Sequence, residues 1–547
     1  MRASLRFLLV AAAMLWCGPV SGQQASLRPR LVVVLLIDQF RSDYIRWYGR
    51  QWKSGLRRVL DRGAWFTNAA YPYMNTVTCS GHATVATGDL PAQHGIVLNQ
   101  WYDRAAGRVV SCTADEQVKT LAHRGDERSG RSAARLLSTT LAEELRAQLG
   151  PESRTVTLSL KARSAIMLAG RGPGLALWFD NATASWATST AFAPQLPSFV
   201  LEFIRNRPVE ADFGKQWTRM LRAGAYKFED NGPDERPPAG WTNSFPHALV
   251  GQADKPDARF YELWRQSPYS DEYLAQMAKV AVQALRLGSG SSTDFLGVSF
   301  SALDLTGHDF GPHSQEVQDV LVRLDATIGD LLVFLDSAVG RNHYLLALTT
   351  DHGVATIPET LARKGLSAGR VSISQLYAAA QSVLEAVLGP GHHVLRVEHT
   401  DLYLAPGVLE KLTAQPPALR AVIDALQAVP GVERVFHRDE MTALAGHGDP
   451  LGRAVSLSYH ADRSGDLLMV PKANWILSAD ATTHGTARSY DAHVPLILMG
   501  AGIRPGKYAA AASPADIAPT LASLCGIRFE GRAGRLLTAA LAARRTN

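Results

Sequence analysis

Short runs of apolar, largely β-branched residues recur along the chain, and each run stops abruptly at a polar residue. The runs cover residues 31–37, 155–160, 295–303 and 344–350, and the residues that follow them are Asp38, Lys161, Asp304 and Asp351. Continuous apolar runs of this length are typical of parallel strands covered on both faces. We therefore expect all four runs to be strands of a buried sheet.

Amphipathic helical patterns lie between the expected strands. Residues 136–149 form one such pattern, which closes on Gly150, and apolar positions from Val317 to Leu335 share one helical face. Strands that alternate with helices predict an α/β fold, with a doubly wound, mostly parallel sheet flanked by helices. Ligands of such sheets bind beyond the carboxyl ends of the strands, where the four polar residues fall.

Two segments depart from this alternation and predict inserted subdomains. Residues 361–480 contain Pro/Gly-rich breaks and have a separate helix–strand–helix character, and residues 170–260 are rich in Trp and Pro. The main sheet resumes near residues 494–500, followed by a helix around residues 514–524. We therefore expect a core made of residues 28–360 and 481–540, with the 170–260 insertion near its functional site.

The N-terminus has the pattern of a secretory signal peptide over residues 1–22. Arg2 and Arg6 precede an apolar run over residues 7–16, and small residues follow at positions 20–22. The run is shorter than the roughly 20 apolar residues that span a bilayer. We expect an exported protein, periplasmic or secreted, without stable membrane insertion once the signal is removed. Whether Cys17 is lipidated stays open.

Composition and charge narrow the function only slightly. With 46% hydrophobic and 19% charged residues, the chain is typical of globular proteins. The net charge of +6 comes from scattered basic residues, so we expect no nucleic-acid partner. Beyond the signal peptide, Cys79, Cys112 and Cys525 allow at most one intramolecular disulfide, and whether Cys112 and Cys525 pair stays open. We expect a monomer.

Six carboxylate and imidazole side chains follow the expected strands or lie late in the chain. They are Asp38, Asp304, His308, Asp351, His352 and His484. A mixed Asp/His set favours a divalent metal, with zinc the natural choice, and six ligands for two ions leave each an open catalytic position. Taken singly, each would be an ordinary turn or surface residue. The histidines at positions 94, 123, 247, 313, 392 and 393 are assigned to that class.

A hydroxyl nucleophile is indicated by the segment around Thr78. Small residues from Ser80 to Ala86 predict the start of a tightly packed helix, which places Thr78 at a helix N-terminus. Free N–H groups and the helix dipole favour negative charge there. A neighbouring metal ion would make an alkoxide accessible. Thr78 could equally serve only as a helix cap, and both roles can hold together.

Together these residues resemble the alkaline phosphatase superfamily. The stretch TCSGHATVATGDLPAQHGI, residues 78–96, is similar to the branch with a threonine nucleophile. That branch contains nucleotide pyrophosphatase/phosphodiesterases and the phosphate-irrepressible bacterial alkaline phosphatases. The resemblance runs from about residue 31 to residue 536 and implies two zinc ions. One ion would be held by Asp304, His308 and His484, and the other by Asp38, Asp351 and His352.

Two further matches favour the monoesterase group of that branch. Asn99 matches an asparagine that donates to a phosphoryl oxygen in both groups, and Lys161-x-Arg163 matches the cations that the monoesterases place over the phosphoryl group. The resemblance therefore implies hydrolysis of small phosphate monoesters through a phosphothreonine at Thr78, with Asn99, Lys161 and Arg163 on the non-bridging oxygens.

Three alternatives use other chemistry. A phosphodiesterase or nucleotide pyrophosphatase would use the same metals and stays open as the second hypothesis. A sulfatase would need formylglycine at Cys79, but Ser80-Gly81-His82-Ala83 lacks the Pro and Arg of that maturation signal. Cys79 is thereby left without an assigned chemical role. An inactive binding protein is disfavoured, because the nucleophile and all six ligands are present.

Overall fold

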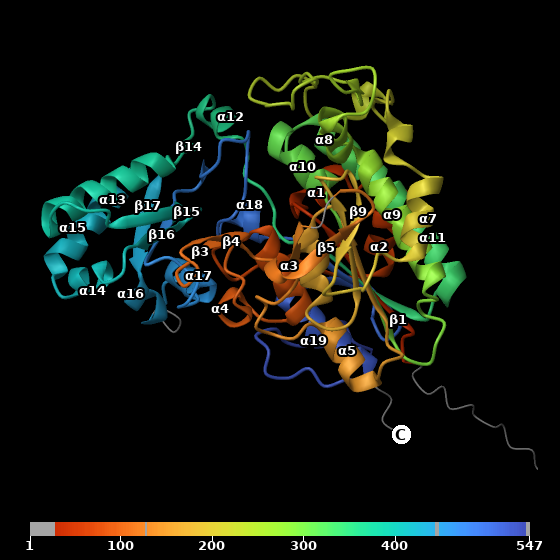
Figure 1. The fold of residues 1–547 in the computed structure, drawn as a ribbon. Coiled ribbons are helices and arrows are strands. Elements are labelled where there is room, and N and C mark those ends of the chain that lie inside the picture. Colours follow the sequence, from red (N-terminus) through yellow and green to blue (C-terminus); the bar gives the residue numbers. More distant parts are fainter. Residues whose placement is uncertain (1–27, 126–127, 444–447, 543–547) are drawn as a thin grey trace, which may run out of the picture.

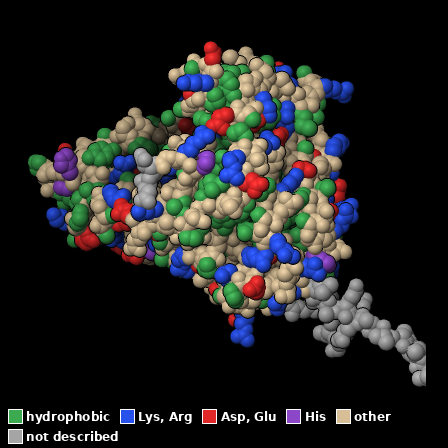
Figure 2. All heavy atoms as spheres, turned by 45° about the vertical axis from the view of Figure 1, so that its right-hand side comes forward, with side chains coloured by type: hydrophobic (Ala, Val, Ile, Leu, Met, Phe, Trp, Pro, Cys, Tyr) green, Lys and Arg blue, Asp and Glu red, His purple; other side chains and the backbone are tan. Residues whose placement is uncertain are grey.

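The computed structural model describes residues 28–125, 128–443 and 448–542 (Figure 1). The expected signal peptide and Cys17 lie outside these residues. Within the described part of the chain, no helix is both long enough and apolar enough to cross a membrane. Basic and acidic side chains are interspersed over the face shown in Figure 2.

The centre of the molecule is a parallel sheet built from the apolar runs. β1 (Leu31–Ile37) lies between β12 (Asp294–Phe300) and β13 (Tyr344–Thr349), and pairs with both in parallel. β7 (Thr155–Ser159) and β8 (Leu175–Asp180) extend the parallel part beyond β12. Every residue of β1 and β12 is buried, as two covered faces require. The predicted α/β class is confirmed.

Antiparallel strands complete both sides of this sheet, which has eleven strands among the described residues. One side adds β20 (Leu496–Gly500), β2 (Ala64–Ala69) and β21 (Gly506–Ala512), and the other adds β9 (Ser185–Ser189), β5 (Ala114–Ala122) and β6 (Arg128–Arg131). β8 and β9 fall inside the segment expected to be an insertion. They belong to the main sheet because β8 pairs in parallel with β7.

Alternate residues of β1 face two separate helical layers. Val33 and Leu35 belong to a core with helices α2 (Gly55–Arg62), α9 (Pro268–Ala284) and α11 (Gln315–Leu335). Val32 and Val34 belong to another core with α5 (Leu141–Leu149) and α19 (Ile517–Cys525). The result is a three-layer helix–sheet–helix arrangement, as the doubly wound pattern predicts.

Helix α5 begins five residues later than the sequence pattern suggested, and local capping is the reason. The Thr140 hydroxyl accepts from the Glu143 backbone N–H, and the Glu143 carboxylate accepts from the Thr140 N–H. This reciprocal capping box satisfies two backbone donors at the helix start. The helix closes at Gly150, which has a φ of 92°, as predicted.

A second sheet with its own core occupies the left of Figure 1. Its strands are β15 (Val394–Glu398), β16 (Asp401–Leu404), β18 (Leu467–Pro471) and β17 (Val432–His437), in that order. Helices α13 (Ile373–Leu388) and α15 (Pro416–Gln427) pack on it. The turn between β15 and β16 contacts the main body, where the Thr400 hydroxyl donates to Asn75 Oδ1 at 3.1 Å.

Candidate active site

Carboxylates from several chain segments converge beyond the carboxyl ends of the parallel strands. Asp38 follows β1 and Asp351 lies two residues after β13, and both are fully buried. Asp304 differs from the sequence expectation, because β12 ends at Phe300 and Asp304 lies in the first turn of α10 (Ala302–Phe310). The helix places His308 one turn after Asp304, with His308 Nε2 3.4 Å from Asp304 Oδ1.

A lysine ammonium lies between two of these carboxylates. Lys161 Nζ is 2.8 Å from Asp38 Oδ2 and 2.5 Å from Asp304 Oδ2. Burial lowers the pKa of Lys161, but the carboxylates of Asp304 and Asp38 outweigh it and raise the pKa overall. Burial likewise opposes ionisation of Asp304, yet Lys161 and His308 hold its pKa well below the usual range. Buried negative charge therefore persists here and needs cations beside it.

Three histidines present the same ring nitrogen to this region. Their Nδ1 atoms lie 2.9 Å from backbone carbonyls: His308 from Thr482 O, His352 from Gly353 O, and His484 from Thr76 O. A carbonyl oxygen can only accept, so Nδ1 carries the proton and the Nε2 lone pair faces the carboxylates. This is the tautomer that a metal ligand requires, held by backbone partners.

The donor atoms form two groups, each of a size that fits one metal ion. Asp304, His352 and His484 offer ligand atoms within 4.8 Å of one another, and so do Asp38, His82 and Asp351. Asp351 Oδ2 is buried without a hydrogen-bond partner and lies 3.2 Å from His352 Nε2. An oxygen and a nitrogen that are both acceptors at this separation repel unless a cation neutralises them. The residues therefore fit a divalent metal.

The two groups differ in part from the sets implied by the resemblance. His308 lies beside the first group, with its ring 5.3 Å from that of His484. His352 lies between the groups, because its Nε2 is 3.2 Å from Asp351 Oδ2 and 4.0 Å from Asp304 Oδ1. All six candidate ligands are thus brought into one buried region, and His352 borders both groups.

His82 was not among the candidates from sequence reasoning. Its Nδ1 lies 2.9 Å from the Thr78 carbonyl, and its Nε2 lies 2.8 Å from Ser299 Oγ, which donates to Asp38 Oδ1. Both ring nitrogens therefore have hydrogen-bond partners within the chain. The available signal was its position four residues after Thr78, which places both on one helical face.

Thr78 is the first residue of α3 (Thr78–Thr87), and all ten residues of this helix are buried. Its Oγ1 lies 3.5 Å from His352 Nε2, so the predicted position at a helix N-terminus beside the metal-binding groups is observed. Small residues are needed because the helix contacts the Asp351 backbone. A Cβ at Gly81 would lie 2.4 Å from the Asp351 carbonyl oxygen.

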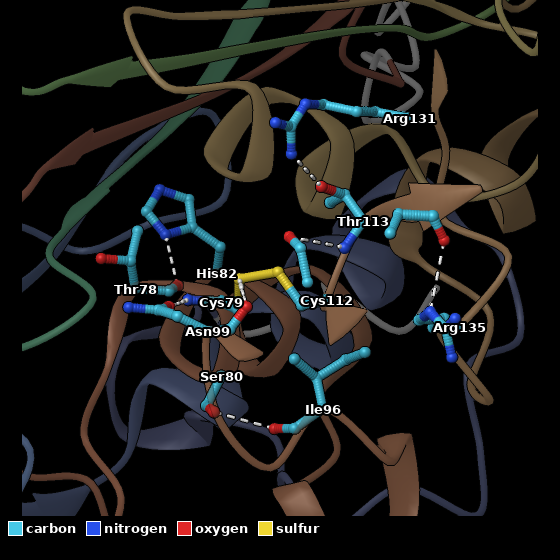
Figure 3. The surroundings of a disulfide bond; sticks show 12 residues. Thr78, Cys79, Ser80, His82, Ile96, Asn99, Cys112, Thr113, Arg131 and Arg135 are labelled. Atoms are coloured by element: carbon cyan, nitrogen blue, oxygen red, sulfur yellow. Dashed lines mark hydrogen bonds between the residues drawn. A yellow bond between two sulfur atoms is a disulfide. The ribbon is translucent and has the colours of Figure 1, made fainter. Parts of the chain in front are cut away.

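Asn99 is oriented toward Thr78 by a backbone contact. The Cys79 N–H donates to Asn99 Oδ1 at 2.8 Å, and the nitrogen end of the Asn99 amide points toward Thr78 (Figure 3). Arg163 lies on α6 (Ala162–Ala169), two residues after Lys161, and its Nε is buried without a hydrogen-bond partner. The structure thus places Asn99 beside Thr78, and Lys161 beside Asp38 and Asp304.

The cysteines pair in a way that the sequence left open. Cys79 and Cys112 form a disulfide (Figure 3). Cys525, on α19, is a buried free cysteine, so Cys112 and Cys525 do not pair. Cys79, which had no role in the sequence reasoning, is therefore covalently bound beside the candidate nucleophile.

Relatives of known activity match nearly the whole chain. The family model described as type I phosphodiesterase / nucleotide pyrophosphatase matches residues 32–494. Alkaline phosphatase PhoV of Synechococcus elongatus is 32% identical and covers 98% of this chain and 99% of its own length. Alkaline phosphatase PafA of Elizabethkingia meningoseptica is 33% identical and covers 93% of this chain and 94% of its own length.

Solved structures agree with these matches. The crystal structure of wild-type PafA superposes with a TM-score of 0.86 at 32% identity, covering 94% of this chain and 99% of that one. A PafA mutant, substituted at one threonine, one asparagine, one lysine and one arginine, superposes equally well, with a TM-score of 0.86 at 31% identity. The chain belongs to the type I phosphodiesterase / nucleotide pyrophosphatase family and, within it, to the enzymes that these alkaline phosphatases represent.

Proposed function

We propose that this protein is a zinc-dependent phosphomonoesterase that releases inorganic phosphate through a phosphothreonine at Thr78. The observation that carries the proposal is the 3.5 Å approach of Thr78 Oγ1 to His352 Nε2, between two groups of metal-binding side chains. The contact of Asn99 with Cys79 and those of Lys161 with Asp38 and Asp304 support roles for these two residues at the same site. The full-length alkaline phosphatase relatives support phosphate monoesters as the substrate class.

Two zinc ions would be held by the six predicted ligands. Asp304, His308 and His484 would hold one ion, and Asp38, Asp351 and His352 the other. The uniform Nδ1-to-carbonyl bonding of the three histidines and the unpartnered Asp351 Oδ2 support this assignment. Zinc at this place supplies Lewis-acid stabilisation of negative charge on oxygen.

The chain's own residues would perform two displacements. Thr78 Oγ, deprotonated at the helix N-terminus, forms a bond to phosphorus while the bond from phosphorus to the alcohol oxygen breaks in line. The alcohol leaves with a proton from solvent. A water oxygen then attacks the phosphothreonine, the bond from Thr78 Oγ to phosphorus breaks, and phosphate departs.

The three other residues would bind the non-bridging oxygens throughout. Since Asn99 Oδ1 accepts from the Cys79 N–H, its amide nitrogen is left to donate to phosphate. Lys161 and Arg163 would add positive charge where a monoester dianion carries its oxygens. Threonine, asparagine, lysine and arginine are also the four residue types substituted together in the PafA mutant, which supports these roles.

A phosphodiesterase is the second candidate, because the family model is named for that activity. The test uses the double variant Lys161→Ala/Arg163→Ala and matched aryl mono- and diesters. Two lost charged hydrogen bonds should lower monoester kcat/KM by about 10²- to 10⁴-fold. Diester hydrolysis should fall much less, because a diester carries one charge fewer. Arg171→Ala, at an arginine paired with Glu143 on α5, serves as the control.

The result discriminates between the two activities. A wild-type preference for the diester would favour the phosphodiesterase. Equal losses on both substrates would remove the role of Lys161 and Arg163 in selecting monoesters.

We also propose that the protein is exported by the segment of residues 1–22 and acts on small esters as a monomer in the periplasm or outside the cell.

A further inference from the structure

The Cys79–Cys112 disulfide lies directly beside the candidate nucleophile. Cys79 follows Thr78 in α3, and Cys112 follows β4 (Arg108–Ser111), 33 residues away in the sequence. Both cysteines are fully buried. β4 forms a hairpin with β3 (Gln100–Asp103), which begins one residue after Asn99. The disulfide thus joins the helix that carries Thr78 to the hairpin that follows Asn99 (Figure 3).

Asn99 is bonded to both halves of this link. The Cys79 N–H donates to Asn99 Oδ1 at 2.8 Å, and the Cys112 N–H donates to the Asn99 carbonyl at 2.9 Å. Because an N–H must meet an oxygen, the first bond turns the NH₂ end of the amide toward Thr78. One cysteine therefore orients the Asn99 side chain, and the other holds its backbone.

The hairpin and α3 share a buried core but only one covalent link. Trp101 of β3 and Val110 of β4 belong to the same hydrophobic core as Cys79 and Ala83 of α3. β3 and β4 form a two-stranded sheet that pairs with no strand of the main sheet in the described residues. The disulfide is therefore the covalent constraint between the hairpin and the helix that carries Thr78.

We propose that the Cys79–Cys112 disulfide is a positioning element of the active site, which fixes the Asn99 amide relative to Thr78 Oγ. The inference rests on the proposed roles of Thr78 and Asn99. The geometry of a reacting centre is sensitive, since a misplacement of about 1 Å can cost about 10²-fold in rate. Asn99 is hydrogen-bonded to two cysteines that are covalently joined to each other. This arrangement would keep the distance from its side-chain amide to the phosphoryl oxygen constant through both displacements.

A double-mutant cycle tests this coupling in the zinc-loaded full-length protein. Cys79→Ala/Cys112→Ala is made in the wild type and in Asn99→Ala, and kcat/KM is measured with an aryl phosphate. Asn99→Ala alone should lower kcat/KM by about 10²-fold. Removal of the disulfide should lower it by about tenfold in the wild type but by less than about twofold in Asn99→Ala, because the positioned group is absent there.

Two controls separate positioning from general stability. Cys525→Ala removes a buried cysteine outside the disulfide and should leave kcat/KM unchanged. Zinc content, measured by elemental analysis, should stay the same in all variants. If the paired substitution prevents folding, Cys112→Ala alone gives the same cycle and leaves the residue next to Thr78 intact.

The outcomes distinguish this inference from the proposed function. Equal losses in the two backgrounds, or no loss in the wild type, would overturn the positioning role while leaving the phosphatase mechanism intact. An Asn99→Ala variant with wild-type kcat/KM would overturn the inference together with the role of Asn99. A loss of kcat/KM on removal of the disulfide that occurs in the wild type and is absent in Asn99→Ala would establish the inference.

Discussion

Among the residues that the structure describes, two buried clusters of histidine and carboxylate invite comparison, because one has the character of a metal site and the other does not. The sheet-edge cluster comprises the six candidate ligands beyond the carboxyl ends of the strands. The insertion pair is His247 on β11 (His247–Ala248) and Glu316 on α11, with His247 Nε2 2.8 Å from Glu316 Oε1 and both side chains fully buried. Aromatic rings surround His247, including Trp241 at 4.7 Å between ring centroids.

The two clusters differ in how burial acts on their charges. Burial lowers the pKa of His247 to about 4 and raises that of Glu316 well above its usual range, so burial favours the neutral form of both groups. At the sheet edge burial also opposes ionisation of Asp351, but His352 outweighs it and holds the pKa of Asp351 below its usual range. Composition and burial alone therefore do not identify a metal site. Carboxylates that stay charged although they are buried do.

The strongest test of the difference between the two clusters is a carboxylate-to-amide substitution in each of them. Asp351→Asn removes an anionic ligand, so bound zinc should fall and monoester kcat/KM should drop by more than about 10⁴-fold, as loss of several kcal/mol of charge stabilisation implies. Chelation of the wild type should abolish activity, and zinc should restore it. An active preparation without bound transition metal would contradict the two-zinc hypothesis.

Within the sheet-edge cluster, removal of the candidate nucleophile should lower turnover without releasing the bound metal. Thr78→Ala leaves all six candidate ligands in place, so zinc content should stay near two ions while kcat falls by about 10³-fold or more. No phosphothreonine should be trapped by acid quench of the variant, whereas the wild type should yield one. Wild-type turnover by Thr78→Ala would show that another group attacks phosphorus.

The insertion pair should tolerate the change that the sheet edge cannot. Since burial favours the neutral form of the Glu316 carboxyl, the neutral isostere in Glu316→Gln should preserve its hydrogen bond to His247. We expect zinc content and kcat/KM within about twofold of wild type, and a change of less than about 1 kcal/mol in the free energy of unfolding. A large loss of zinc would mean that the pair belongs to the metal site.

Much of the fold was predictable because its strands carry their own signal. β1, β7, β12 and β13 are buried on both faces, so their sequences form largely apolar runs that end near the ends of the strands. The exception was the end of β12, where the apolar residues Ala302 and Leu303 continue the run but already belong to α10. A buried strand and a buried first helical turn have the same composition.

The site was predictable as a set of residues, and less so as a geometry. Motif and spacing indicated which residues converge beyond the strand ends, whereas the disulfide between Cys79 and Cys112 depends on a distance across the fold. His82 was missed because its contact with Ser299 forms only when α3 packs on the sheet. β8 was missed as a strand of the core because its neighbour in sequence, β9, turns back antiparallel.

The last prediction concerns stability and no change in activity: an acid sensitivity of the insertion pair. Burial holds the pKa of folded His247 at about 4, below the value of about 6.5 for a solvated imidazole. As pH falls, His247 of the unfolded chain takes up a proton before His247 of the folded protein does. The stabilisation of the folded protein by neutral His247 is therefore complete above about pH 6.5 and is lost toward about pH 4. His247→Gln removes that proton. Between about pH 7 and about pH 5, the free energy of unfolding of the wild type should therefore fall by about 2 kcal/mol more than that of His247→Gln.

Denaturant titrations at both pH values measure this difference in the free energy of unfolding. His392→Gln, at an exposed histidine, controls for the loss of an imidazole as such. Parallel pH profiles of wild type and His247→Gln would mean that His247 is already charged in the folded protein, and the contrast between the two clusters would then fail.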